Sequence, residues 1–219
     1  MIRRHFIATV IALCSVGAWG APPGPSAAHG ASQTPRTILV LGDSLSAEYG
    51  LPRGTGWVAL LQKRLAAEKI PAQVQNASIS GETTSGGRSR LAALLVADKP
   101  GIVILELGAN DALRGLPLAM TQENLNQMTR AAQQAGAKVL LIGMQVPPNY
   151  GSDYANHFAA TFGQVARANK AALVPFLLKG IADAPDAAQL FQSDRIHPIA
   201  AAHPTLLNNV WPELKKLLK

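Results

Sequence analysis

Four short segments of the chain carry side chains that could do nucleophilic and acid–base chemistry. They read GDSLS at 42–46, SGETT at 80–84, GAND at 108–111 and DRIHP at 194–198. Serine, histidine and aspartate are the residues of hydrolytic triads, in which an imidazole oriented by a carboxylate takes the proton of a hydroxyl. Together these types indicate covalent catalysis by a serine, although each segment alone is also typical of an ordinary turn.

Ser44 is the candidate nucleophile. It directly follows an apolar, β-branched run at 37–41, and Gly42 permits a tight turn that would project the serine hydroxyl over the edge of a sheet. Glycine, aspartate and serine are also common turn residues, so this segment by itself favours a turn without chemistry.

His197 is the candidate base, with Asp194 as its partner. Three-residue spacing allows the Asp194 carboxylate to accept from one ring nitrogen and leaves the other free to take a proton. The alternative is an exposed histidine in a turn. The remaining histidines fit the role less well, because they lie near the N-terminus, in a predicted helix or just before the final helix: His5, His29, His157 and His203. A metal site formed by Asp194, His197 and His203 lacks a fourth ligand motif, so we predict no metal.

Gly81 and Asn110 follow the second and third predicted strands. A glycine lets a backbone N–H approach a reacting group closely, and an asparagine amide can donate to a developing oxyanion. The competing interpretations are a turn before a helix for Gly81 and an Asx turn or helix cap for Asn110.

The elements that would position these residues alternate between strands and helices. We expect strands at 37–41, 73–79, 102–107, 139–142 and 172–176, and helices at 56–69, 89–97, 121–135 and 154–170. A last helix carries apolar residues from Leu206 to Leu217, with Pro212 kinking it or resetting its start. Alternation implies parallel strands with crossover helices, and apolar strands without polar alternation imply that both sheet faces are covered. The sequence therefore predicts an α/β fold, a three-layer α/β/α sandwich with a parallel sheet of about five strands. Because ligands bind at the carboxyl ends of such strands, the four segments should meet there.

The segment 145–152 should open onto the same edge of the sheet. Pro148 and Asn149 shape a stiff turn, and Tyr150 offers an apolar ring with a polar tip, so we predict that these three residues bind substrate. The alternative is a surface loop in which Tyr150 packs on the following helix.

The N-terminus predicts export. Residues 1–20 combine Arg3 and Arg4 with a short apolar stretch and a small-residue exit, as in a secretory signal peptide cleaved near Gly20; an uncleaved anchor is the alternative. Residues 21–36 are rich in Pro, Gly, Ala and Ser and suggest a flexible leader before one domain at 37–219. We expect a periplasmic or secreted protein without a stable membrane span in its mature form. The only cysteine, Cys14, lies in the signal, so the mature chain has no thiol chemistry.

Composition narrows the class further. A hydrophobic content of 48% in 219 residues suits one folded domain with a sizeable core. The net charge of +7 is not gathered in a dense basic run with interleaved aromatics, so we predict no nucleic-acid partner.

The four segments, in this order, resemble the SGNH or GDSL hydrolase superfamily over about 37–218, nearly the whole predicted domain. The stretches GDSLSAEYGLPRGTGW, NASISGETT, ELGANDALRG, PPNYG and DRIHP look like its bacterial arylesterase, acyl-CoA thioesterase and lysophospholipase branch. The resemblance implies a flavodoxin-like fold and a serine esterase or thioesterase that acts on small acyl esters or thioesters through an acyl-enzyme, without a cofactor. It implies Ser44, Asp194 and His197 as catalytic residues and an oxyanion hole from the N–H groups of Ser44 and Gly81 with the Asn110 amide.

Two alternatives remain open at this point. One is an acyltransferase or carbohydrate acetyl esterase of the same fold, and the other is a non-catalytic relative that binds acyl chains or carbohydrates. The chain departs from the family's usual pattern at Arg195, where glycine is usual, at Ile199, where asparagine is usual, and at Ala109, where glycine is common in this branch. None of these changes removes a reacting group, but Arg195 could alter the loop beside His197.

Overall fold

A computed structural model describes residues 36–219, so the predicted signal peptide (1–20) and the leader up to residue 35 lie outside the described residues. The domain is built on five parallel strands: β1 (Arg36–Gly42), β2 (Ala72–Asn76), β3 (Ile102–Glu106), β4 (Lys138–Ile142) and β5 (Ala172–Val174). Their order in the sheet is β2-β1-β3-β4-β5. This order is the flavodoxin-like one, and it confirms the predicted α/β fold with a five-stranded parallel sheet.

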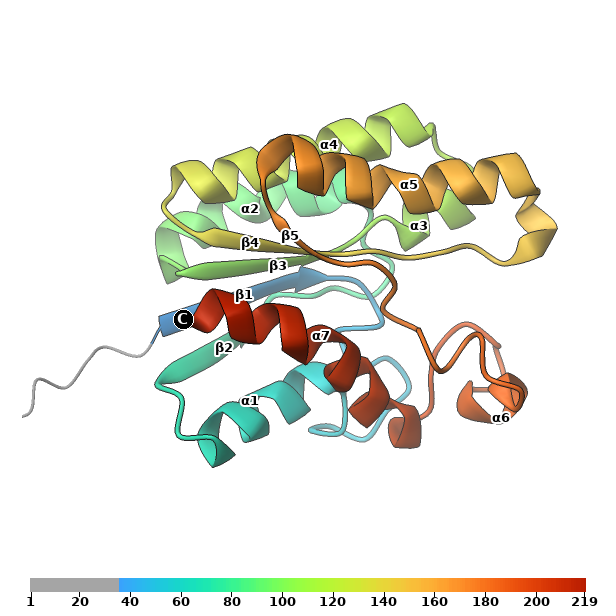
Figure 1. Ribbon diagram of the computed structural model, residues 1–219, viewed down its shortest axis with the longest axis horizontal. Helices are drawn as coiled ribbons and strands as arrows, with labels where there is room; N and C mark the ends of the chain where they lie inside the picture. The colour runs from blue at the N-terminus through green and yellow to red at the C-terminus, as the bar shows by residue number, and fades with distance from the viewer. Residues whose placement is uncertain (1–35) are drawn as a thin grey trace, which may run out of the picture. The chain divides into compact units, whose positions relative to one another are not determined.

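Helices cover both faces of the sheet (Figure 1). On one face lie α1 (Trp57–Ala67) and α7 (His203–Leu218), and on the other lie α2 (Thr84–Asp98), α4 (Leu118–Gln134) and α5 (Ser152–Asn169). Short helices follow the strands at the loop edge: α3 (Ala109–Leu113), η1 (Pro148–Tyr150), α6 (Ala187–Leu190) and η2 (Ala200–Ala202). None of the helices within 36–219 is both long enough and apolar enough to cross a bilayer.

The core lies between the sheet and these two helix layers. All five residues of β3 are buried, while β2, at the edge of the sheet, is largely accessible. On α1, Trp57, Leu61 and Leu65 are completely buried, which is the four-residue spacing expected of a helix with one apolar face. Full burial of one such side chain stabilises the fold by about 1.5–3 kcal/mol.

Three predicted boundaries were wrong by three residues or more. The third helix was expected to begin at 121, but α4 begins at Leu118. The second strand was expected to reach Ile79, but β2 ends at Asn76 and Ile79 is half exposed. The second helix was expected to begin at 89, but α2 begins at Thr84. The adjacent glycines in its first turn have low helix propensity, yet a Cβ at Gly87 would clash with the side chain of Leu107, the residue directly after β3. Close packing against the sheet therefore selects glycine here and overrides local propensity.

The last helix excludes one of the two effects that were predicted for Pro212. It begins at His203 and continues through Pro212, so the proline does not set its start.

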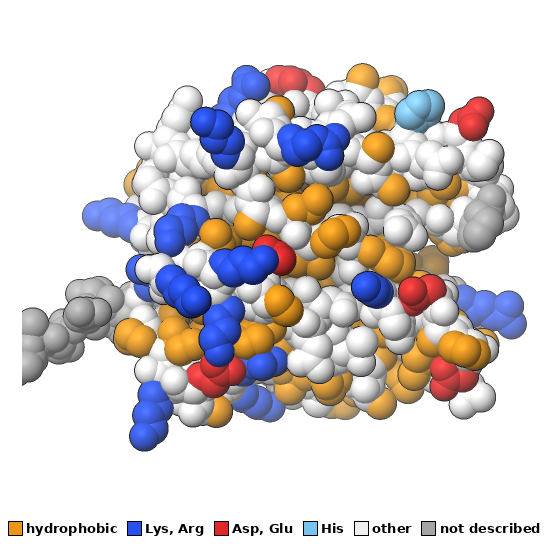
Figure 2. Space-filling view, in the orientation of Figure 1, with side chains coloured by type: hydrophobic (Ala, Val, Ile, Leu, Met, Phe, Trp, Pro, Cys, Tyr) orange, Lys and Arg blue, Asp and Glu red, His pale blue; other side chains and the backbone are white. Residues whose placement is uncertain are grey.

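Basic side chains gather at one end of the molecule, on the left in Figure 2. Lys69, Lys99 and Lys170 each follow the end of a helix in the left-handed conformation, with φ between 42° and 54°. A cation at a helix C-terminus is favoured by the partial negative charge of the last carbonyl groups. These lysines thus complement the helix ends. They precede β2, β3 and β5, so they lie at the amino ends of the strands, opposite the predicted site.

Candidate active site

The turn after β1 presents Ser44. The Asp43 carboxylate accepts the Leu45 N–H at 3.0 Å, and the Asp43 carbonyl accepts the N–H groups of Ser46 and Ala47. A Cβ at Gly42 would lie 2.8 Å from the Glu106 carboxyl oxygen, so the turn can approach β3 this closely only with glycine. The local hydrogen bonds fix a tight turn whose second side chain, Ser44, faces the pocket.

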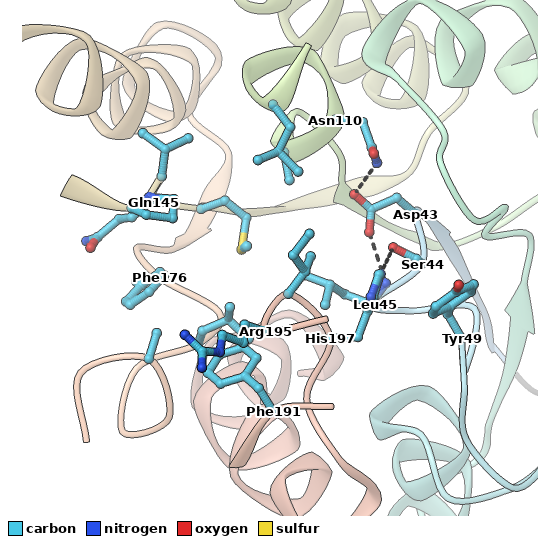
Figure 3. A pocket seen from close by; sticks show the side chains of 18 of the residues that line it. Asp43, Ser44, Leu45, Tyr49, Asn110, Gln145, Phe176, Phe191, Arg195 and His197 are labelled. Carbon is cyan, nitrogen blue, oxygen red and sulfur yellow. Dashed lines mark hydrogen bonds between the residues drawn. The ribbon is translucent and has the colours of Figure 1, made fainter. Parts of the chain in front are cut away.

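Ser44, His197 and Asp194 form a continuous hydrogen-bonded chain (Figure 3 shows the Ser44–His197 link). His197 Nε2 lies 2.8 Å from Ser44 Oγ, and His197 Nδ1 lies 2.7 Å from Asp194 Oδ2. With the carboxylate accepting from Nδ1–H, Nε2 is left as the acceptor for the serine proton. The sequence placed these three residues in one site, and the structure brings them within hydrogen-bonding distance.

Asp194 is held in its ionised form. Partial burial of Asp194 raises its pKa. The carboxylate also accepts the backbone N–H groups of His197 and Ile196, at 3.0 and 2.9 Å, and faces the His197 ring. These contacts outweigh the effect of burial and lower the Asp194 pKa to about 2. Arg195, between them, adopts φ 59°, a left-handed conformation that glycine takes without strain. The loop therefore keeps the predicted Asp194–His197 geometry with an arginine where the family usually has glycine.

Two residues that sequence reasoning missed hold this loop. Gln192 donates its backbone N–H to the His197 carbonyl at 2.7 Å, and its side-chain amide donates to the carbonyls of Tyr49 and Pro198 at 3.0 and 3.2 Å. The Tyr49 ring packs against the His197 ring, with 4.4 Å between their centroids. The contacts of Tyr49 could not be read from the sequence, because Tyr49 lies about 150 residues away from the loop that it supports.

Gly81 and Asn110 lie beside Ser44 in the same pocket. Within residues 36–219, the N–H groups of Ser44 and Gly81 donate no hydrogen bond, so both are free to receive an oxyanion. The Asn110 amide donates to Asp43 Oδ2 and to the Glu82 carbonyl, each at 3.0 Å (Figure 3 shows the bond to Asp43). To reach an oxyanion, Asn110 must share or redirect one of these hydrogens.

A buried polar network joins the segments that carry Gly81 and Asn110. Asp111 at the start of α3 is completely buried and accepts the Thr84 N–H at 2.8 Å and the Thr84 hydroxyl. Thr121 also donates to Asp111, and Asn124 donates to Thr84 at 3.0 Å. Because α2 and α3 share this carboxylate, Gly81 and Asn110 are held in a fixed relation.

The pocket that contains Ser44 has a volume of about 580 Å³ and extends into a mainly apolar chamber. Figure 3 shows it running from Tyr49 and Ser44 toward Phe176, Phe191 and Arg195. Its apolar lining comes from α3 and from loops after several strands: Leu45, Leu113, Met144, Val146, Pro147, Phe176, Leu178, Phe191 and Ile196. A chamber of this size and character suits an acyl chain.

Two of the three predicted substrate-binding residues lie outside this chamber. Tyr150 and Asn149 are exposed and do not line the pocket, and the Tyr150 ring stacks on Tyr154 of α5 with 6.5 Å between centroids. From the turn η1 the Tyr150 ring is directed toward α5, and the wall comes instead from the preceding residues Gln145, Val146 and Pro147. The prediction that Tyr150 forms the wall is therefore corrected in favour of its alternative.

The other candidate groups are accounted for elsewhere. His157 is exposed on α5. His203 is buried, and its Nδ1 accepts the Trp57 N–H at 3.0 Å, so it satisfies the first turn of α1 rather than joining Asp194 and His197. Burial lowers the pKa of His203, in keeping with a neutral ring.

The fold and this site define a serine hydrolase: a flavodoxin-like sheet with a Ser–His–Asp chain and two free N–H groups at the carboxyl ends of its strands. Residues 40–204 match the GDSL-like Lipase/Acylhydrolase family, and the chain belongs to that family.

Named relatives agree with this assignment. The chain is 54% identical over 183 residues to esterase TesA of Pseudomonas aeruginosa, covering 84% of this chain and 90% of the relative. It is 37% identical to thioesterase 1/protease 1/lysophospholipase L1 of Escherichia coli K12, covering 83% and 85%.

Solved structures agree as well. A crystal structure of TesA is similar with a TM-score of 0.80 and 53% identity, covering 83% of this chain and 99% of that one. That of the psychrotrophic esterase EstA from a Pseudoalteromonas species, inhibited by monoethylphosphonate, has a TM-score of 0.78 and 42% identity, covering 84% and 98%.

Proposed function

We propose that this hydrolase cleaves carboxylic esters and acyl thioesters through an acyl-enzyme on Ser44. The observation that carries the proposal is the 2.8 Å contact between Ser44 Oγ and His197 Nε2, with Asp194 fixing the other ring nitrogen. The names of its relatives, among them an arylesterase of Vibrio mimicus, support this substrate class.

In the acylation step, Ser44 Oγ attacks the acyl carbon while His197 Nε2 takes the hydroxyl proton. The carbonyl oxygen becomes an oxyanion and accepts from the N–H groups of Ser44 and Gly81 and from the Asn110 amide. Collapse of this intermediate expels the alcohol or thiol, which receives the proton held by His197.

In the deacylation step, water attacks the acyl carbon and gives its proton to His197. Collapse breaks the bond to Ser44 Oγ, which takes that proton back, and the carboxylic acid leaves. Each step uses only residues of the site and water, and no cofactor is required by this sequence of steps.

The acyl chain would occupy the apolar chamber that leads from Ser44 to Phe176 and Phe191. These walls lie on one side of the nucleophile, so the alcohol or thiol would leave on the Tyr49 side (Figure 3).

The test is labelling with a fluorophosphonate probe followed by mass spectrometry, with hydrolysis of p-nitrophenyl esters and acyl-CoA thioesters measured in parallel. We expect one adduct, at Ser44, and loss of both labelling and hydrolysis in Ser44→Ala. Ser80→Ala is the matched control, because Ser80 lines the same pocket without a bond to His197. An adduct on Ser80, or hydrolysis that survives in Ser44→Ala, would refute the proposal.

We propose further that the protein is exported to the periplasm or secreted. The support is the basic and then apolar character of residues 1–20. Expression of the full chain, fractionation and N-terminal sequencing should give a periplasmic product that begins near residue 21, whereas an uncut product in the membrane fraction would contradict cleavage.

A further inference from the structure

Two carboxyl groups lie buried together beneath the nucleophile. Asp43, which directly precedes Ser44, is 1% exposed, and Glu106, at the end of β3, is completely buried. Gly42, the last residue of β1, pairs with Glu106 of β3, and the N–H of the next residue, Asp43, donates to Glu106 Oε2 at 3.4 Å. The triad mechanism uses neither carboxyl group, although burying both is costly unless each is satisfied.

The hydrogen-bond partners of the two Asp43 carboxylate oxygens are all donors. Oδ1 accepts the Leu45 N–H and Oδ2 accepts the Asn110 amide, each at 3.0 Å. An ionised carboxylate, which only accepts, fits this environment.

The two oxygens of Glu106 have different surroundings. Oε2 accepts the Ser46 hydroxyl at 2.7 Å, and Ser46 in turn accepts the indole N–H of Trp57 at 3.2 Å. Oε1 is buried and receives no donor from the described residues. An ionised oxygen without a donor in the core would be strongly destabilising, whereas a protonated Oε1 is itself a donor.

We propose that Glu106 is protonated and donates a hydrogen bond to the Asp43 carboxylate. The pair then carries a single negative charge, on Asp43. This charge holds the Asn110 amide and the Ser44 turn in position for catalysis. Glu106 is thus a positioning residue that acts through Asp43. This inference rests on the proposed serine mechanism, which it deepens.

The electrostatics favour this distribution of one proton over two groups. Burial and the charge of Asp43 raise the pKa of Glu106 well above its ordinary range. Burial also raises the pKa of Asp43, but hydrogen bonds from Leu45, Glu106 and Asn110 and the facing His197 limit the rise to about 6. Glu106 from β3 and His197 from the C-terminal loop are the titratable groups that act on Asp43 within the described residues. Two carboxylates in contact do not both ionise readily, so the less solvated one retains the proton.

The arrangement has a kinetic consequence. The free enzyme is active only with His197 neutral and Asp43 ionised, so two protonations switch it off on the acid side. The plot of log(kcat/KM) against pH should therefore reach a slope of about 2 at low pH, where a lone histidine would give about 1.

The first experiment compares Glu106→Gln with Glu106→Met. Glutamine retains an N–H for Asp43 and an oxygen for Ser46, while methionine has neither. We expect Glu106→Met to lose about tenfold or more in kcat and to need higher pH for activity, because Asp43 loses a donor that favours its ionised form. Glu106→Gln should restore most of kcat and the wild-type acid limb. Equal damage in both variants, or a wild-type acid limb in Glu106→Met, would overturn the proposal.

The second experiment uses Asp43→Asn, in which the limiting acid slope should fall from about 2 to about 1 together with kcat. Thr129→Ala is the control, since Thr129 is buried in α4 and donates only to Leu125 of the same helix. A slope of about 1 in the wild type already contradicts the role of Asp43.

A spectroscopic readout separates this inference from the mechanism on which it rests. The infrared spectrum of the wild type at pH 7 should contain a protonated-carboxyl band that is missing from the spectrum of Glu106→Gln. This holds whether or not Ser44 proves to be the nucleophile. Absence of that band in the wild type would show that Glu106 is ionised and would overturn the proposal, and the band remains informative even if Glu106→Met fails to fold. Failure of the serine mechanism would appear separately, as unlabelled Ser44.

Discussion

At the scale of single residues, the site depends on side chains that do no chemistry themselves. Asp43 accepts from Asn110, Gln192 ties the His197 loop to the Tyr49 carbonyl, and Tyr49 packs on the His197 ring. Each of these residues restricts a reacting group to one position, which is how a hydrolase gains rate without new chemical groups.

Asn110→Ala should keep the fold and lower kcat on the order of 10²-fold, because the variant removes one donor to the oxyanion. The measurement is steady-state kinetics with a p-nitrophenyl ester, with circular dichroism to verify folding. Asn126→Ala is the control, since Asn126 bonds to Asn169 on the helix layer. A folded Asn110→Ala with wild-type kcat would leave Asn110 only a turn residue.

Asp43→Asn should gain stability relative to the wild type as the pH rises. The folded-state pKa of Asp43, about 6, lies above its ordinary value of 3.8, so the folded protein binds this proton more tightly than the unfolded chain. The stabilisation of the folded state by proton binding to Asp43 is therefore fully present below pH 3.8 and is lost as the pH rises through 6.

Urea unfolding of both proteins at pH 4 and pH 7.5 checks this linkage. The difference in unfolding free energy between Asp43→Asn and wild type should shift in favour of the variant on the order of 2 kcal/mol between the two pH values. Glu123→Gln, which changes an exposed carboxylate on α4, should show no such shift. A pH-independent difference for Asp43→Asn would contradict burial of the Asp43 charge.

At the scale of elements, alternation of apolar strands with amphipathic helices was enough to predict all five strands and the major helices. The ends of elements were harder to predict, because tertiary contacts determine them. The first turn of α2 contains Gly86 and Gly87, which suggest a loop until the close approach of Leu107 is known. Tyr150 illustrates the same limit in the site: a sequence can place it in a loop, but the direction of its ring depends on Tyr154 one turn later.

Glu106 was missed for a related reason. In the sequence it is the last residue of an apolar strand, and no local pattern shows that a carboxyl group there faces the turn of another strand. A charged residue within a strand that is otherwise wholly buried was the available signal.

Asp111→Ala should destabilise the junction of α2 and α3. Loss of the carboxylate leaves the Thr84 N–H and hydroxyl without their acceptor in the core, which costs about 2–4 kcal/mol in unfolding free energy. Because Gly81 and Asn110 lie on the joined segments, kcat should fall as well. Urea unfolding and ester hydrolysis measure the two effects. The control, Thr129→Ala, loses one hydrogen bond within α4 and should cost only about 1 kcal/mol without a change in kcat. Equal changes in unfolding free energy and kcat in the two variants would show that Asp111 does not hold α2 and α3 together.

At the scale of the whole molecule, the site is assembled from segments that follow all five strands, with Gly81 supplied by the segment after β2. The nucleophile comes after β1, Asn110 after β3, the wall from Met144 to Pro147 after β4, and Phe176 and Leu178 after β5. Parallel strands bring these ends to one edge, which is why the sequence could predict that the candidate residues meet. The far end of the chamber could not be predicted in this way, because residues 176–191 hold only the short helix α6 among irregular loops whose path depends on packing.

Ala182→Trp should shorten this chamber and change the preference for acyl-chain length. Ala182 lines the pocket, which it shares with Phe176 and Leu178, and it follows β5 rather than the segments that carry Ser44. An indole there should exclude the distal carbons of a long acyl chain and leave an acetyl group unaffected. Each methylene that can no longer be buried forfeits about 0.8 kcal/mol, so exclusion of two to three of them should lower the octanoyl-to-acetyl ratio of kcat/KM about 10- to 50-fold.

The measurement is a series of p-nitrophenyl esters from acetate to decanoate on both proteins. Val96→Trp adds the same ring at an exposed position of α2 that is not part of the pocket lining, and it should leave the ratio unchanged. If Ala182→Trp lowers kcat/KM equally for every chain length, the acyl chain does not extend toward Ala182, and the chamber must instead receive the leaving group.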